Sequence, residues 1–236
     1  MMAKVMGIVN VTPDSFSDGG KYYRADEAVA RARNMVADGA DIVDLGGEST
    51  RPGATPLEWA DEWSRVEPVL SALVACLKVP VSVDTYHPET AERAVALGAK
   101  IVNCVYTDPI PRMIEICRKS GATLVMPAKC LDCAELDLDG LDYCLDPMIG
   151  FGTTREEDVA LLRSIPELAK RGRVLVGASR KRIVKKLTGE KLTGKNLGGN
   201  IGIAVWCAMN GAEIVRVHDV KETVQALKVV SALSAT

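Results

Sequence analysis

The chain has 236 residues, of which 47% are hydrophobic and 25% are charged, and its formal net charge is −2. This is the composition of a globular protein with a sizeable core, and we expect one domain over residues 1–236. There is no basic block to bind a nucleic acid, and no apolar run approaches the ~20 residues of a membrane span. A strand-like segment begins almost at once, which leaves no room for a signal peptide, so we expect a cytoplasmic protein.

Strand-like and helix-like segments alternate along almost the whole chain. The strand-like segments lie at residues 5–11, 41–47, 79–85, 100–105, 122–127, 143–147, 173–179 and 213–219. Apolar spacing, capping residues and prolines predict helices at 26–37, 56–77, 88–97, 111–119, 154–169 and 220–230. This alternation favours a parallel sheet, and a length near ~250 residues favours one α/β (β/α)8 TIM barrel.

The fifth crossover of this barrel is short. Only the segment AKCLDCAELDLDGL, residues 128–141, separates the fifth and sixth strand-like segments. A crossover with its helix needs at least ~10–12 residues, so no full outer helix fits. We therefore expect partly covered apolar surface on both strands and loose local packing, because the loop is acidic. A subunit contact could also cover this edge, which keeps a homodimer open as an alternative.

Polar or ionisable residues lie at the carboxyl ends of seven of the eight strand-like segments. They are Asn10, Asp44, Asp84, Asn103, Asp146, Ser179 with Lys181, and Arg216 with His218. A charged group at the end of a buried strand is costly unless it meets a partner, water or a ligand. Because a barrel of this type carries its active site at the carboxyl ends of its strands, these residues predict a ring around that site.

The character of the ring residues indicates two kinds of ligand. Asp84, Asn103 and Asp146 together could bind a flat heterocycle with alternating donors and acceptors, such as an aminopyrimidinone, although each alone could cap a local backbone group. Arg216 and His218 lie two residues apart, hence on one face of the last strand. With Arg51, they indicate a phosphate or pyrophosphate site, although Arg51 alone could form a surface ion pair.

The cysteines give a weaker indication. Seven cysteines are present, and Cys130 and Cys133 form a C-x-x-C pattern. A single such pair without nearby histidines is a weak indication of a metal site. We interpret the cysteines as structural thiols, with redox or zinc use as the alternatives.

Five segments in this order, NVTPDSFSDGG, GGESTRPGA, SVDT, SRK and RVHDV, resemble the dihydropteroate synthase family, and the resemblance covers nearly the whole chain. That family is a pterin-binding (β/α)8 barrel that condenses 6-hydroxymethyl-7,8-dihydropterin pyrophosphate with p-aminobenzoate. The resemblance implies transfer of a pterin-methyl group to an arylamine, with release of pyrophosphate, in folate biosynthesis. These two small molecules are then the expected partners.

The resemblance also assigns residues. It implies a pterin site at Asp84, Asn103, Asp146 and Lys181. It implies a pyrophosphate site at Asn10, Thr50, Arg51, Arg216 and His218, with Mg²⁺ near Asn10. Pro52, Phe151, Lys181 and Arg182 would border the p-aminobenzoate pocket, and Phe16 and Asp18 would come from the first loop. The catalytic residues would be Asp18, Lys181 and Arg51, with Asp18 stabilising positive charge on the pterin methylene.

The chain departs from the family pattern on strands four to six. The usual Asn-Asp is Asn103-Cys104, the usual Met-His-Met is residues 126–128 (MPA), and the usual Asp-Pro-Gly ends in Met148. Thr153 and Asn196 replace a usual lysine and arginine. Two alternatives follow: a pterin-binding methyltransferase domain that uses a reduced folate and a corrinoid partner, or a non-catalytic pterin-binding protein. The former has no need of Arg51, Arg216 and His218 as a pyrophosphate cluster.

Overall fold

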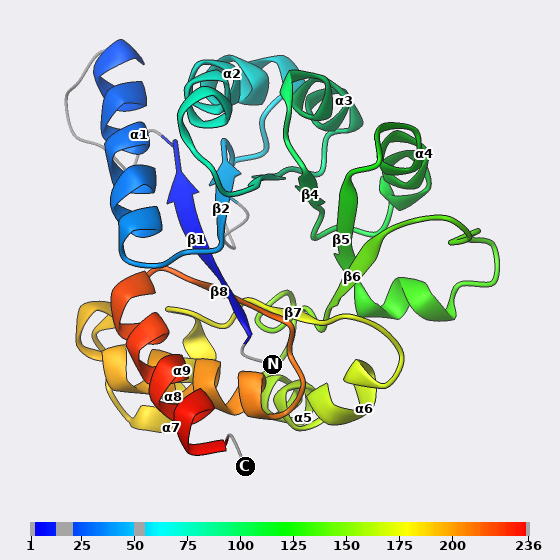
Figure 1. The fold of residues 1–236 in the computed structure, drawn as a ribbon. Coiled ribbons are helices and arrows are strands. Elements are labelled where there is room, and N and C mark those ends of the chain that lie inside the picture. The colour runs from blue at the N-terminus through cyan, green and yellow to red at the C-terminus, as the bar shows by residue number, and fades with distance from the viewer. Residues whose placement is uncertain (1–2, 13–20, 50–54, 235–236) are drawn as a thin grey trace.

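The computed structural model describes residues 3–12, 21–49 and 55–234, and within them eight parallel strands form one sheet that curls into a barrel (Figure 1). The strands are β1 (Lys4–Asn10), β2 (Ile42–Gly46), β3 (Val81–Asp84), β4 (Ile101–Asn103), β5 (Thr123–Pro127), β6 (Tyr143–Asp146), β7 (Leu175–Val176) and β8 (Ile214–Val217). Their order is β6-β5-β4-β3-β2-β1-β8-β7. An isolated parallel bridge between Leu145 and Val174 joins the two edges, which confirms the predicted TIM barrel.

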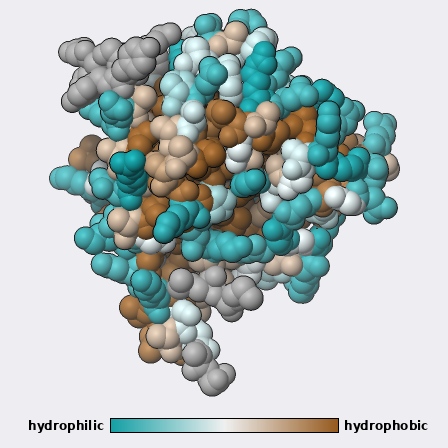
Figure 2. Space-filling model, turned by 45° about the horizontal axis from the view of Figure 1, so that its top comes forward, coloured by the Kyte–Doolittle hydropathy of each residue, from teal (hydrophilic) through white to brown (hydrophobic). Residues whose placement is uncertain are grey.

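Helices surround the strands in Figure 1. They are α1 (Lys21–Ala37), α2 (Trp59–Cys76), α3 (Pro88–Leu97), α4 (Ile110–Ser120), α5 (Arg155–Arg163), α6 (Ile165–Ala169), α7 (Arg182–Thr188), α8 (Leu197–Met209) and α9 (Val220–Ser234). On the face drawn in Figure 2, hydrophobic residues gather toward the centre and hydrophilic residues lie mainly around them. No helix within the described ranges is long and apolar enough to cross a bilayer.

Local sequence explains most helix boundaries, and it explains one wrong prediction. Thr154 and Glu157 form the expected capping box, and Gly98 and Gly121 end α3 and α4 in the left-handed conformation. The helix predicted over 154–169 is instead divided into α5 and α6, because Pro166 lacks the N–H that a continuous helix would use. The glycine-rich helix α8 was not predicted, and α1 begins five residues before the predicted start at residue 26.

The barrel interior has an apolar lower layer. Side chains of seven strands form one buried cluster: Met6, Ile42, Ile101, Val125, Cys144, Leu175 and Ile214. Side chains alternate along a strand, so residues two and four positions further on point into the same interior. Those next positions include the polar residues Asp44, Asn103, Asp146 and Arg216, and on β3 Asp84 lies two residues after Ser82, which pairs with Ile101. The apolar layer therefore closes the floor below a polar layer at the carboxyl ends of the strands.

The fifth crossover is short, as predicted, but its predicted partial exposure is wrong. It contains only the short 3-10 helix η2 (Ala128–Asp132) and turns, whereas β5 and β6 are buried apart from their first residues. Leucines of the loop cover them: Leu141 is buried, and Leu131, Leu136 and Leu138 pack against the same cluster.

Three arginines hold the acidic residues of this loop at its outer side. Arg118 of α4 donates to the carbonyl oxygens of Asp137 (2.8 Å) and Asp139 (3.1 Å). Arg171 pairs with Asp132, and Arg173 pairs with Asp142. The side chains of Asp132, Asp137 and Asp142 thus pair with arginines while the leucines face inward, so the acidity of the loop does not prevent its packing.

Candidate functional site

The predicted ring of polar residues lies at one mouth of the barrel. Asn10, Asp84, Asn103 and Asp146 are each the last residue of a strand. Asp44 lies two residues before the end of β2, and Arg216 lies inside β8 with His218 just after it. Lys181 follows β7 by five residues, immediately before α7. The register of the parallel strands brings these side chains to the same end because Gly46 pairs with Asp84, which in turn pairs with Asn103.

Arg216 forms the centre of the site by bridging two carboxylates. Its guanidinium donates to Asp44 Oδ2 at 2.6 Å and to Asp84 Oδ2 at 2.5 Å. Burial raises the pKa of Asp84 to about 7, against the opposing effect of Arg216 and with a further increase from Asp44. Burial alone would lower the pKa of Arg216, but Asp44 and Asp84 raise it, so this guanidinium stays charged.

Two buried acceptors in this layer have no hydrogen-bond donor among the described residues: Asp44 Oδ1 and Asn103 Oδ1. The Asn103 amide nitrogen makes only a long contact with Asp44 Oδ2, at 3.5 Å. Buried polar atoms of native proteins are nearly always paired, so an unpaired acceptor needs an explanation. A ligand that presents N–H groups to the barrel mouth would satisfy both.

Lys181 closes another side of the mouth. Its Nζ donates to the Ile149 carbonyl oxygen at 2.6 Å and lies 4.3 Å from the centre of the Phe151 ring. Burial lowers the pKa of Lys181 to about 8, although Asp146 raises it. Gly150 permits this arrangement, since a Cβ there would lie 3.1 Å from the Lys181 side chain and its φ is +79°.

Asp146 is held by the turn that follows β6. Its Oδ1 accepts from the backbone N–H of Met148 at 2.7 Å, and burial raises its pKa while Lys181 lowers it. Met148 has a φ of +65°, a conformation that suits glycine better than a residue with a side chain. The turn thus keeps the conformation expected of an Asp-Pro-Gly sequence although Met replaces the glycine.

His218 lies on the side of the mouth formed by β7 and β8. Its Nδ1 lies 3.1 Å from the Ser179 hydroxyl, which also accepts from the His218 backbone N–H at 3.3 Å. Burial, together with Arg180 and Arg216, lowers the pKa of His218 to about 3. The imidazole is therefore neutral at pH 7 and acts as a hydrogen-bonding group, not as a cation.

The remaining predicted residues fall into two groups. Asn10 points its amide oxygen toward Gly46, where a Cβ would lie 3.3 Å from it, and Arg182 is exposed at the first position of α7. Phe16, Asp18, Thr50, Arg51 and Pro52 lie outside the described residues.

Sequence reasoning placed Asp44 at a strand end but gave it no role, and it missed Asn200 and Asp219. The pairing of Asp44 with Arg216 spans 172 positions and depends on β2 and β8 pairing with opposite sides of β1. Asn200 gave no indication because it lies in the helix that was not predicted.

The departures from the family pattern have local structural roles. Cys104, which replaces an aspartate, is buried, and burial raises the pKa of its thiol to about 12. Thr153 donates to Asp158 at 2.5 Å. Of the C-x-x-C pair, Cys130 is buried and Cys133 is exposed, and both are free thiols.

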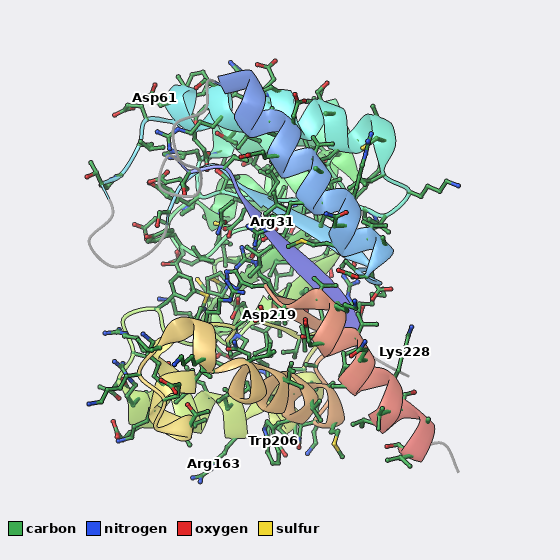
Figure 3. The ribbon with its side chains drawn as sticks, turned by 90° about the vertical axis from the view of Figure 1, so that its left-hand side faces the viewer. Arg31, Asp61, Arg163, Trp206, Asp219 and Lys228 are labelled. Atoms are coloured by element: carbon green, nitrogen blue, oxygen red, sulfur yellow. The ribbon has the colours of Figure 1, made fainter. Side chains whose placement is uncertain are left out.

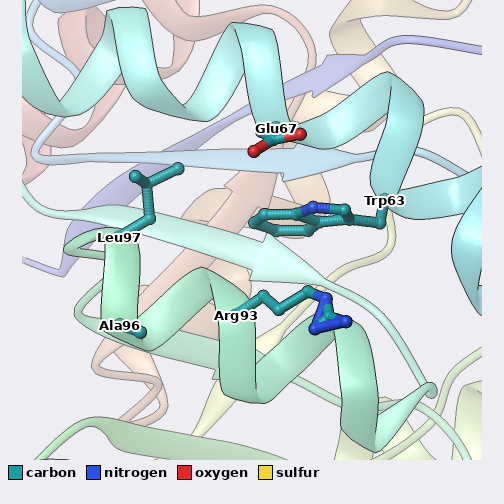
Figure 4. A pocket seen from close by; sticks show the side chains of 5 residues that line it. All are labelled: Trp63, Glu67, Arg93, Ala96 and Leu97. Atoms are coloured by element: carbon teal, nitrogen blue, oxygen red, sulfur yellow. The ribbon is translucent and has the colours of Figure 1, made fainter.

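A separate pocket of about 390 Å³ lies outside the mouth, between α2 and α3 (Figure 4). Trp63, Glu67, Arg93, Ala96 and Leu97 line it, and Figure 4 shows the Trp63 ring between the Glu67 and Arg93 side chains. It belongs to the helical shell and contains none of the ring residues.

Comparison with known proteins defines the class of this site. The family described as pterin binding enzyme matches residues 6–136 and 126–218. The chain is 39% identical over 264 aligned residues to the dihydropteroate synthase of Neisseria meningitidis serogroup B, covering 98% of this chain and 92% of that protein. It is 36% identical to the dihydropteroate synthase of Bacillus subtilis, covering 97% of this chain and 88% of that protein.

Solved structures of dihydropteroate synthases agree with this sequence comparison. The dihydropteroate synthase of Xanthomonas albilineans with 4-aminobenzoic acid superposes with a TM-score of 0.92 at 38% identity, covering 100% of this chain and 94% of that chain. The complex of that enzyme with 7,8-dihydropteroate gives a TM-score of 0.88 at 36% identity, with 100% and 95% coverage. The fold and the site are those of a pterin-binding enzyme of the TIM-barrel class. Within that class, the chain belongs to the dihydropteroate synthase family.

Proposed function

We propose that this protein condenses 6-hydroxymethyl-7,8-dihydropterin pyrophosphate with p-aminobenzoate and releases pyrophosphate. The observation that carries the proposal is the buried polar layer at the barrel mouth, in a chain that belongs to the dihydropteroate synthase family. The alternative of methyl transfer from a reduced folate does not need an arginine and a histidine beside the pterin ligands, whereas Arg216 and His218 lie there.

The pterin ring lies between Asp84, Asn103, Asp146 and Lys181 in this proposal. The unpaired oxygens of Asp44 and Asn103 support it, because a pterin edge carries N–H groups that can donate to them. Asp146 offers both carboxylate oxygens to the aminopyrimidinone edge, because the oxygen that already accepts from the Met148 N–H can accept a second hydrogen bond. A carboxylate that accepts two parallel N–H bonds gives both affinity and orientation.

The pyrophosphate lies toward Arg216, His218 and Asn10. The Ser179 hydroxyl accepts from the backbone N–H of His218, so its own proton can donate to His218 Nδ1. This arrangement leaves the ring proton on Nε2, where it can donate to a phosphate oxygen. The predicted contributions of Thr50 and Arg51 belong to the same subsite.

In the reaction, the bond from the pterin methylene carbon to the pyrophosphate oxygen breaks and leaves positive charge on that carbon, and the amine nitrogen of p-aminobenzoate then forms its bond to the carbon. The bonding electrons leave with the pyrophosphate, and the amine proton passes to solvent or to the departing oxygens. Arg216 and His218 stabilise the charge that develops on those oxygens. Asp18 and Arg51 remain predicted catalytic residues, and Phe151 with Lys181, Arg182 and Pro52 remains the predicted border of the p-aminobenzoate pocket.

The proposal includes Mg²⁺ beside Asn10. Among the described residues, no group of three or more His, Cys, Asp or Glu side chains could hold a metal ion. This fits an ion that takes most of its ligands from pyrophosphate and water, as Mg²⁺ does in phosphate sites. When bound, it would offset negative charge on the leaving group.

A homodimer is also part of the proposal. Trp206 and Met209 on α8 are 48% and 66% exposed, lie three residues apart and therefore share one helix face. Trp206 lies at the outer edge of the molecule in Figure 3, away from the mouth. Paired large apolar residues of this kind favour a partner, and two-fold dimers are the commonest assembly. Sedimentation of the wild type and Trp206→Lys tests this, with a dimer expected only for the wild type.

A cytoplasmic location remains a prediction from the sequence.

Two matched variants test the division into pterin and pyrophosphate subsites. Asp146→Asn should weaken binding of a pterin without pyrophosphate by ~10-fold or more, because a charge-assisted pair of hydrogen bonds is lost. Arg216→Ala should weaken the pyrophosphate ester more than the unesterified pterin. Calorimetry with both ligands decides the question, and equal losses for both ligands in both variants would contradict the assignment.

A further inference from the structure

Two loops at the mouth are joined to each other by contacts between their side chains. One loop follows β7 and carries Ser179, Arg180 and Lys181, and the other follows β8 and carries His218 and Asp219. Arg180 Nη2 donates to Asp219 Oδ1 at 2.5 Å, one residue away from the contact between Ser179 and His218. The two loops therefore hold Lys181 and His218 in a fixed relation.

A single side chain of α8 reaches both loops. Asn200 is 6% exposed, and its Oδ1 accepts from the backbone N–H of Arg180 at 2.9 Å. Its Nδ2 faces Asp219 Oδ2 and Asn196 Oδ1, each at 3.4 Å. Figure 3 shows Asp219 just before α9 and close to α8, which agrees with these contacts.

The backbone at Arg180 needs such support. Its φ is +60°, a left-handed conformation that is unfavourable for a residue with a Cβ. Lys181 is the next residue, and its own backbone N–H donates to Ala178 in the same turn, at 3.2 Å. A change of the Arg180 backbone would therefore move the Lys181 side chain away from Ile149 and Phe151.

We propose that Asn200 is a positioning residue that fixes Lys181 in the pterin subsite and His218 in the pyrophosphate subsite, through Arg180 and Asp219. The inference rests on the proposed function for the roles of Lys181 and His218, but the contacts themselves do not. The ion pair of Arg180 with Asp219 is partly exposed, at 39% and 18%, and exposed pairs contribute little alone. The buried amide of Asn200 is the group that holds both loops.

Asn200→Ala and Asn200→Asp distinguish the two arms of this contact: the arm through Arg180 to Lys181, and the arm through Asp219 to His218. The alanine variant loses the contacts with both loops, so it should weaken a pterin without pyrophosphate by about tenfold through Lys181, and the pyrophosphate ester by more than that, because the ester also loses His218. The aspartate variant keeps an acceptor for the Arg180 N–H but places a carboxylate beside Asp219. It should therefore spare the simple pterin and weaken mainly the pyrophosphate ester. Asn210→Ala is the matched control, because Asn210 lies at the other end of α8, where its side chain donates to the Trp206 carbonyl oxygen within the same helix.

A second readout does not depend on substrate. Burial and the positive charge of Arg216 lower the pKa of Lys181 to about 8, whereas the carboxylates of Asp146, Asp84 and Asp158 oppose this by raising it. In Asn200→Ala, a displaced Lys181 should titrate toward its ordinary value of 10.5. Amine labelling of Lys181 as a function of pH, read by mass spectrometry, measures this in wild type, Asn200→Ala and Asn210→Ala.

The outcomes are distinct. A higher labelling midpoint in Asn200→Ala, with no change in the control, supports the inference even if no product ever forms. An unchanged midpoint with unchanged pterin affinity in a folded Asn200→Ala would overturn it. If Asn200→Ala does not fold, Asn200→Asp decides the question. Equal losses of affinity for the simple pterin and for the pyrophosphate ester in Asn200→Asp would overturn the proposed separation of arms. Failure of the wild type to bind any pterin would refute the proposed function alone.

Discussion

At the scale of single residues, the burial of Asp84, with Asp44 nearby, makes the site sensitive to pH. The folded protein holds a proton on Asp84 up to a pKa of about 7, whereas the unfolded chain releases it near 3.8. The folded state thus binds more protons between these values, and the free energy of unfolding falls as pH rises across that interval. Lys181, with a pKa of about 8 against an ordinary 10.5, has the opposite effect at higher pH.

Asp84→Asn isolates the contribution of Asp84 to the pH dependence of the free energy of unfolding. The variant keeps the shape of the side chain but cannot titrate. Its free energy of unfolding minus that of the wild type should therefore increase from pH 4 to pH 8, because only the wild type loses stability over this range. Denaturant titrations of both proteins across this range measure the difference. A difference that stays constant with pH would show that Asp84 ionises at its ordinary pKa.

The sequence was sufficient to place most of the mouth residues, and physical reasons limit the rest. Asp84, Asn103 and Asp146 could be identified because a polar residue at the end of an apolar run is visible without a structure. The contacts that join the mouth residues were not visible: Arg216 meets Asp44 because β8 and β2 pair with opposite sides of β1, and Asn200 acts through a backbone N–H. The roles assigned to Phe16, Asp18, Thr50, Arg51 and Pro52 stay predictions.

At the scale of elements, the fifth crossover shows that a short loop can replace a covering helix. Its leucines bury β5 and β6, and Arg118 holds two of its carbonyl oxygens from α4. The prediction of a short crossover was right because it followed from counting residues. The prediction of exposure was wrong because counting residues does not show which side chains of a loop turn inward.

Arg118→Ala should therefore loosen this loop. Hydrogen bonds from a charged donor contribute about 1.5–3 kcal/mol when buried, and partial exposure of Arg118 reduces this to about 1 kcal/mol. Hydrogen exchange should show wild-type protection over residues 123–127 and 143–146 similar to that of β1, with faster exchange over 133–142 in the variant. Arg112→Ala is the control, since Arg112 lies at the surface of the same helix as Arg118 but pairs with Glu92 of α3 and Glu115 of α4, away from the loop. Faster exchange of β5 and β6 than of β1 in the wild type would restore the expectation of a loose edge.

At the scale of the whole molecule, the barrel could be predicted because its strands and helices alternate regularly, and each parallel strand is a short apolar run. Sequence did not show how the barrel closes between β6 and β7, where an isolated bridge and a hydrogen bond from Leu145 to Arg173 join the edges. That closure brings Asp146 and Lys181 to the same mouth as Arg216. The proposed chemistry therefore depends on the complete barrel and not on any single motif.

One assay tests the central claim most directly: formation of dihydropteroate and release of pyrophosphate by the purified protein, with 6-hydroxymethyl-7,8-dihydropterin pyrophosphate and Mg²⁺, in the presence and absence of p-aminobenzoate. We predict one pyrophosphate per dihydropteroate, only when both substrates are present, and a much slower reaction in Arg216→Ala. If the wild type binds the pterin yet forms no product, it is a non-catalytic pterin-binding protein. That result would contradict the proposed function.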